Sequence, residues 1–211
     1  MNRKRLKAAA KNQIKGKIGI LFAITLIIGL ILFGAGLVLM FIPFGIGSII
    51  SVIIISPAFM LSIVRIYLNI VAGNTPTVKD AFSGFDDFWS AFKVNFLVGL
   101  FTYLWSLLFF IPGIIKSIAY SMSPYILAEN KGKPALECIS ESKAMTKGHK
   151  KKLFVLALSF FGWGILCVIT FGIASIWVVP YINTTYANAY QSLKPDIPAE
   201  KQPVFETSVA E

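Results

Sequence analysis

The chain has 211 residues, of which 56% are hydrophobic and only 14% are charged, and its formal net charge is +10. Soluble domains carry roughly a quarter charged residues, so this composition excludes an ordinary water-soluble globular protein and favours an integral membrane protein. The positive charge then indicates basic residues kept on the cytoplasmic side next to anionic lipid, and we expect no nucleic acid partner.

Residues 1–17 are basic and predict a cytoplasmic amphipathic helix, because Leu6, Ala10 and Ile14 recur at helical spacing among lysines and arginines. The apolar run that follows, Ile18–Ile42, is longer than the core of about 7–15 residues in a cleavable signal peptide. We therefore predict an uncleaved first transmembrane helix.

A transmembrane helix needs about 20 mainly apolar residues, and residues 18–193 contain six apolar runs near that length. They predict an all-α membrane protein with one transmembrane domain of about six helices, arranged as three hairpins over about 18–71, 94–129 and 153–192. A middle hairpin that re-enters without crossing is the alternative. The predicted spans are Ile18–Ile42, Ile46–Val71, Asn95–Ile111, Ile114–Leu127, Leu153–Thr170 and Ile173–Tyr190, with uncharged turns near Pro43, Pro112 and Gly172.

The hairpins resemble one another, since each has a glycine-containing turn and then a proline followed by aromatic or aliphatic residues. We predict that Pro57, Pro124 and Pro180 kink the second helix of each hairpin, because a proline inside a helix removes a backbone hydrogen bond. Structural kinks are favoured over a gating hinge.

Two segments between the hairpins, about 76–93 and 134–148, predict interfacial amphipathic helices on the cytoplasmic side. Aromatic residues recur through the first segment every three or four positions, and the neighbouring Asp86 and Asp87 are expected to be solvated. In the second segment Leu136, Ile139 and Met145 predict an apolar side. The aromatic residues are Phe82, Phe85, Phe88, Trp89, Phe92 and Phe96.

Lysines and arginines lie almost entirely before the first hairpin and between hairpins, whereas the predicted outer turns carry only Lys116. This asymmetry places both termini in the cytoplasm. The polar tail, residues 194–211, is predicted to be disordered there.

Candidate site residues are few. A basic cluster precedes the fifth predicted span and is suited to contacts with lipid headgroups; it comprises Lys147, His149, Lys150, Lys151 and Lys152. Arg65 lies within a predicted span, and we predict either that it pairs with Glu129 or that its side chain reaches the lipid phosphates.

The chain shows no catalytic motif. One histidine and two separated cysteines provide no metal-ligand set, and we find no phosphate-binding loop or nucleophile elbow. The sequence therefore predicts a protein that is not an enzyme and that needs no metal or cofactor.

Several segments together resemble the domain of unknown function 975 family of bacterial membrane proteins. They are Ile111–Lys116, Pro124–Ala128, Ser142–Lys150 and Phe161–Trp163. The resemblance implies a multi-pass protein of the bacterial cytoplasmic membrane without an established activity.

Two functions are compatible with these features. The favoured one is a non-enzymatic membrane protein that organises lipid or partner proteins, with anionic lipids as the expected partners. The alternative is a small transporter or channel with a path between the hairpins. A homo-oligomer is compatible with either function.

Overall fold

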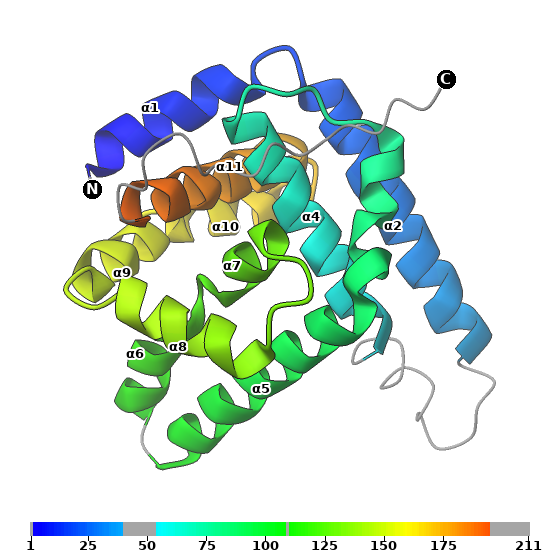
Figure 1. Cartoon of the computed structure of the whole chain (residues 1–211). Helices are drawn as coiled ribbons and strands as arrows, with labels where there is room; N and C mark the ends of the chain where they lie inside the picture. Colours follow the sequence, from blue (N-terminus) through cyan, green and yellow to red (C-terminus); the bar gives the residue numbers. More distant parts are fainter. Residues whose placement is uncertain (1, 40–53, 109, 195–211) are drawn as a thin grey trace.

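The computed structural model describes residues 2–39, 54–108 and 110–194 (Figure 1). Every regular element in these ranges is a helix, so the all-α prediction is confirmed for the described residues. The predicted turn near Pro43 and the predicted tail from residue 195 onward lie outside them.

The N-terminal segment forms two helices, α1 (Arg3–Ile14) and α2 (Ile18–Leu39), and Gly16 between them has a φ of 82°. Leu6, Ala10 and Ile14 are the buried residues of α1. Figure 1 shows α1 beside α11 (Ser175–Leu193), the helix on which it packs most extensively. The predicted helix is confirmed, and its apolar side contacts protein.

Helix α4 (Ser56–Val71) is the centre of the fold, because it packs on α11, on the short helix α7 (Ser123–Glu129), on α5 (Phe88–Leu108) and on the 3-10 helix η3 (Val78–Asp87). Because α4 is surrounded in this way, its side chains Phe59, Ile66 and Tyr67 are buried in the main apolar core. The core therefore lies where the second halves of the predicted hairpins meet.

The segment predicted as one interfacial helix over 76–93 is divided between two elements. Residues 78–87 form η3, and α5 begins at Phe88 rather than at the predicted Asn95. Phe82 and Phe85 both pack edge-on against Phe59, with ring centroids 6.2 and 5.0 Å away. Part of the aromatic stripe therefore attaches η3 to α4.

Helix α5 ends at Leu108 and α6 (Phe110–Tyr120) packs on it, so the boundary between the two helices lies just before the predicted turn at Pro112. Pro112 and Gly113 themselves lie in the first turn of α6. Proline is well tolerated in the first turn of a helix, where its missing N–H has no intrahelical partner. Gly113 serves packing here, since a Cβ on it would lie 2.2 Å from Oγ of Ser106 in α5.

The fourth predicted span is broken into α6 and α7 by a turn at Ser121 and Met122. Helix α8 (Ala135–Met145) docks at this break: Met122 N–H donates to Oγ of Ser142 at 3.1 Å, and that hydroxyl donates to the Ala119 carbonyl at 2.8 Å. The predicted apolar side of α8 is only partly right, because Ile139 is buried and Leu136 is exposed.

The third hairpin consists of α9 (Lys150–Leu158) and α10 (Phe161–Ile169), followed by α11. The predicted turn near Gly172 is confirmed. Gly172 adopts a φ of 88°, and Phe171 beside it is 98% exposed.

The three predicted proline kinks differ in their helical surroundings. Pro180 is within α11, whereas Pro57 and Pro124 occupy the first turns of α4 and α7. Pro124 therefore starts a helix rather than bending one, since proline's fixed φ and missing N–H suit that position. Pro57 differs, because the π-helical residues 54 and 55 directly precede α4, so that helical backbone lies on both sides of this proline.

Two helical stretches among the described residues are long and apolar enough to cross a membrane, by length and composition. They are Ile18–Leu37 in α2 and Lys150–Ile169, which comprises α9 and α10. In each, only 17% of the most apolar 18-residue stretch is buried within the protein. Their apolar side chains thus form much of the exposed surface.

Candidate functional site

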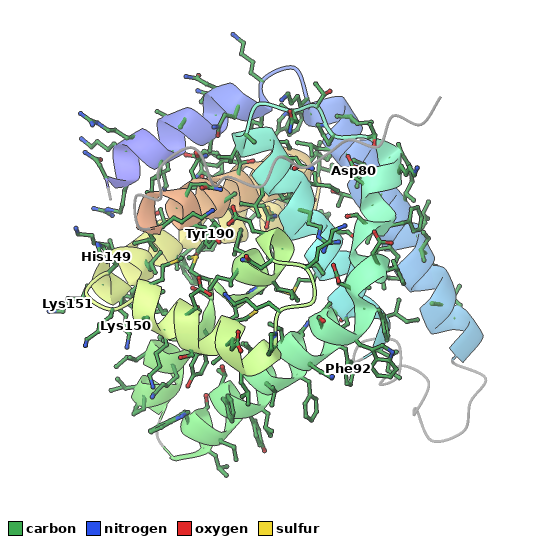
Figure 2. All side chains as sticks on the ribbon, in the orientation of Figure 1. Asp80, Phe92, His149, Lys150, Lys151 and Tyr190 are labelled. Carbon is green, nitrogen blue, oxygen red and sulfur yellow. The ribbon has the colours of Figure 1, made fainter. Side chains whose placement is uncertain are left out.

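Five residues at the junction of α8 and α9 form what we call the basic corner: Lys147, His149, Lys150, Lys151 and Lys152. Gly148 ends the preceding turn with a φ of 83°, and α9 begins two residues later. Lys147, Lys151 and Lys152 are exposed, whereas His149 and Lys150 are half-buried. Figure 2 shows His149, Lys150 and Lys151 together at one edge of the molecule.

The residues that flank the basic corner hold its backbone in place. Thr146 is fully buried, and its hydroxyl donates to the Ser142 carbonyl at 2.8 Å. On the other side, Leu153 and Leu156 of α9 are buried in the main core. The lysines therefore project from a fixed turn, and a row of like charges on such a turn suits an anionic surface.

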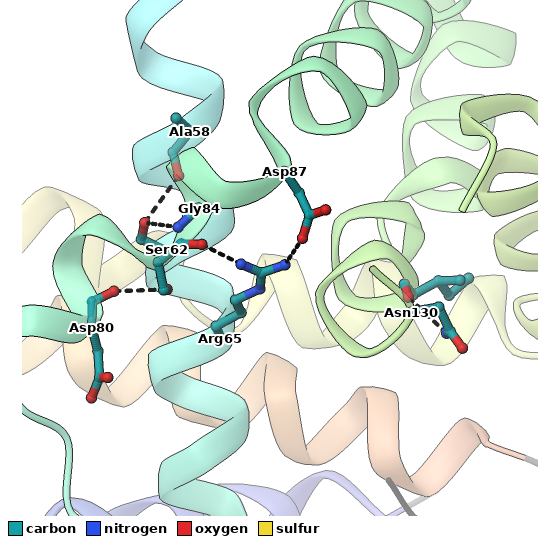
Figure 3. Close-up of polar contacts among 9 residues, drawn as sticks. Ala58, Ser62, Arg65, Asp80, Gly84, Asp87 and Asn130 are labelled. Atoms are coloured by element: carbon teal, nitrogen blue, oxygen red, sulfur yellow. Dashed lines mark hydrogen bonds and ion pairs between the residues drawn. The ribbon is translucent and has the colours of Figure 1, made fainter. Parts of the chain in front are cut away.

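Arg65 is buried in α4, and its partner is Asp87 rather than the predicted Glu129. One guanidinium nitrogen donates to a carboxylate oxygen of Asp87 and another donates to the Ser83 carbonyl (Figure 3). The predicted pairing with Glu129 is wrong because η3 folds back on α4 and brings Asp87 to the guanidinium. The side chain of Asp87 is only 13% exposed, so its expected solvation is also wrong, whereas Asp86 is exposed as predicted.

The fold-back of η3 depends on Ser62 and Gly84. Gly84 N–H donates to Oγ of Ser62 at 2.8 Å, and the Ser62 hydroxyl donates to the Ala58 carbonyl at 3.1 Å. A Cβ on Gly84 would lie 2.0 Å from that carbonyl oxygen, so only glycine permits this approach. The sequence feature that could have indicated this contact is Gly84, which lies between Asp80 and Asp86 in the segment that follows the helix of Arg65.

Glu129 lies at the end of α7 and accepts hydrogen bonds from three side chains near the end of α11. Its carboxylate accepts from Tyr190 Oη at 2.8 Å, Gln191 Nε2 at 3.0 Å and Lys194 Nζ at 2.6 Å. The carboxylate side chain is 9% exposed. Glu129 therefore fastens the last turn of α11 to α7, a role that the sequence did not predict.

Two further titratable groups lie on and beside α8. Lys133 pairs with Glu141, and the hydrogen bond raises the pKa of the lysine. Burial raises the pKa of the Cys138 thiol to about 11. Such a thiol is a poor nucleophile at neutral pH, because the thiolate is the reactive form.

Within the described ranges, no three His, Cys, Asp or Glu residues come close enough to hold a metal ion. The ionic groups in the interior instead contact one another, as in the Arg65–Asp87 and Glu129–Lys194 pairs. What the arrangement can offer chemically is cationic surface beside exposed apolar surface, and this combination suits amphiphilic anions.

Comparison with known proteins identifies the family. The model of one family, described as Protein of unknown function (DUF975), matches residues 1–118 and 108–196. No curated protein and no solved structure matches the chain. Because the two matches together extend over nearly the whole sequence, the chain belongs to the DUF975 family of proteins of unknown function.

Proposed function

We propose that this chain is a multi-pass protein of the bacterial cytoplasmic membrane that organises anionic lipid or partner proteins without catalysing a reaction. In this proposal about six helices cross the bilayer in three hairpins, with both termini, the basic corner and α8 on the cytoplasmic side.

The observation that carries the proposal is the exposed apolar surface of the two helical stretches that are long and apolar enough to cross a membrane, Ile18–Leu37 and Lys150–Ile169. Val168 and Ile169 in α10 are 79% and 68% exposed, and Leu30 and Phe33 in α2 are 60% and 66% exposed. A soluble monomer rarely leaves contiguous apolar surface of this kind open to water, whereas a bilayer would cover it.

The contacts of the interior ionic groups support the proposal of a non-enzymatic role. Arg65, Asp87 and Glu129 each contact protein partners, so these groups serve structure in the described part of the chain. A transporter draws less support, because polar side chains of α11 bond within the protein. Asn183 donates to the Val179 carbonyl of its own helix at 2.9 Å, and Asn188 donates to Oε1 of Gln13 in α1 at 2.6 Å. They are suited to packing helices together rather than to lining a path.

Sedimentation of the purified chain with liposomes tests the proposal. Replacing Lys147, Lys150, Lys151 and Lys152 with glutamine should weaken binding to phosphatidylglycerol vesicles, because each cation near an anionic surface contributes about 1 kcal/mol. The loss should be largest at low salt.

A control variant with Lys4, Arg5, Lys79 and Lys131 changed to glutamine removes the same charge from outside the basic corner. It should bind more tightly than the basic-corner variant. Equal binding of the two variants, or the same salt dependence for the native chain and the basic-corner variant, would overturn the assignment of the basic corner to lipid.

A further inference from the structure

A cavity of about 490 Å³ lies where the end of α1 and the start of α2 meet α10 and α11. Its size falls in the range of about 300–1,000 Å³ that is typical of ligand sites. The lining residues are Lys11, Asn12, Ile14, Lys15, Ile18, Trp163, Trp177, Val178 and Tyr181.

The two sides of this cavity differ in chemistry. The α1 side supplies two cations and an amide, from Lys11, Lys15 and Asn12, whereas α10 and α11 supply the rings of Trp163, Trp177 and Tyr181. Trp163 and Tyr181 pack edge to face with their centroids 6.0 Å apart. An occupant must therefore combine an anionic or polar end with an apolar body.

The charges on the α1 side are free to bind. Lys7, one turn earlier, lies over the Phe160 ring at 4.3 Å and donates to the Ser159 carbonyl at 3.4 Å. Lys11 and Lys15 are exposed, and neither has a carboxylate within ion-pair distance in the described residues. Among the residues that the structure describes, no carboxylate lines the cavity, so its field favours an anion.

A second cavity supplies a contrast. It has about 260 Å³ between α2 and α11, and Phe22, Leu26 and Ile176 are among its lining residues. Within the described part of the chain, no ionisable side chain lines it. Charge therefore distinguishes the first cavity from an ordinary gap between apolar helices.

We propose that the cavity under the end of α1 binds a single anionic phospholipid, with the phosphate at Lys11 and Lys15 and the upper part of its chains against Trp163, Trp177 and Tyr181. The proposal rests on the membrane location argued above, and it adds a defined lipid site distinct from the basic corner. Tryptophan and tyrosine suit this position, because their rings combine an apolar face with a polar edge.

Tryptophan fluorescence tests the proposal, because two of the four tryptophans line the cavity. In the full chain with Trp89→Phe and Trp105→Phe, phosphatidylglycerol with dibrominated chains, at low mole fraction in detergent, should quench the emission saturably. Dibrominated phosphatidylcholine should quench far less. The complementary variant, with Trp163→Phe and Trp177→Phe, should be quenched equally by both lipids.

Charge variants in the first of these backgrounds complete the test. Lys11→Gln with Lys15→Gln should raise the half-saturating lipid concentration roughly 10- to 30-fold, as expected for two cations near a phosphate. Lys4→Gln with Arg5→Gln removes the same charge from exposed positions of α1. This control should change the half-saturating lipid concentration by less than about twofold.

Equal effects of the two double variants, or equal quenching by the two lipids, would overturn the proposal. Complete displacement by free glycerol phosphate would show a site for a soluble anion and would overturn the lipid assignment. If the native chain binds anionic vesicles as proposed while these results fail, only the cavity assignment is wrong; if it does not bind vesicles, the wider function is wrong.

Discussion

Burial of Arg65 is tolerated because its charge is balanced within the fold. Its guanidinium meets Asp87 and the Ser83 carbonyl, although its Nε has no partner among the described residues. Breaking a buried ion pair by removing one partner leaves an uncompensated charge, which costs about 3–5 kcal/mol. The neighbouring Asp86 is exposed and provides a matched control.

Asp87→Asn should therefore lower the stability of the chain by about 3 kcal/mol, toward the lower end of that range because the amide oxygen can still accept from Arg65. Asp86→Asn should change it by less than about 0.5 kcal/mol. The measurement is the thermal unfolding midpoint of the detergent-solubilised protein. Equal midpoints for the two variants would contradict the ion pair.

The reactivity of the Cys138 thiol should depend on pH. Since burial raises its pKa to about 11, the thiolate is scarce at pH 8, and its fraction should rise about tenfold per pH unit until the pKa is reached. In a Cys167→Ser background, maleimide labelling of Cys138 should be slow at pH 8 and should accelerate accordingly. Rapid labelling at pH 7 with no pH dependence would contradict the buried environment.

Among the elements, η3 owes its position to one glycine and one serine. Gly84 lets its backbone approach the Ala58 carbonyl, and Phe59 fills the space beside it with Phe82 and Phe85. The same device recurs where α6 approaches α5 at Gly113 and Ser106. These close contacts hold η3 against α4 and α6 against α5.

Gly84→Ala should destabilise the chain by about 2 kcal/mol or more, because the new methyl group overlaps backbone that cannot move away cheaply. Gly99→Ala, in α5 and with no atom within 4 Å of its added Cβ, should be neutral or slightly stabilising, since alanine favours a helix. The thermal midpoints of the two variants in detergent provide the comparison. A neutral Gly84→Ala would refute the close contact.

For the whole molecule, the distribution of charge predicts which segments lie on each side of the membrane. The hairpin tip at Phe171 is exposed and uncharged, whereas the turn after α7 carries Lys131 and Lys133. If the proposed topology holds, these two sites lie on opposite sides of the bilayer.

Single cysteines test this arrangement. In a variant lacking Cys138 and Cys167, Phe171→Cys should react with a membrane-impermeant maleimide on intact cells, and Lys131→Cys should react only after permeabilisation. A cysteine at Asn2 should behave like Lys131→Cys. Reaction of Asn2→Cys on intact cells would overturn the predicted cytoplasmic N-terminus.

Much of the secondary structure could be predicted, because it depends on local patterns. The stripe of Leu6, Ala10 and Ile14 predicts α1, the apolar run from Ile18 predicts α2, and Gly172 marks the third turn. The boundaries at Pro112 and Asn95 were displaced for a common reason: proline and polar residues are compatible with a helix start or a helix interior as well as with a turn.

The sequence by itself determined the helical class, the family, and the separation of basic from apolar segments, since composition and periodicity are properties of the chain. Only the tertiary structure decided that Arg65 pairs with Asp87, that Glu129 fastens α11 to α7, and that two lysines at the end of α1 line a cavity with aromatic side chains. The reason is physical: electrostatic partners are chosen by distance in space, and the fold-back of η3 and the packing of α1 on α11 depend on contacts between residues far apart in the chain.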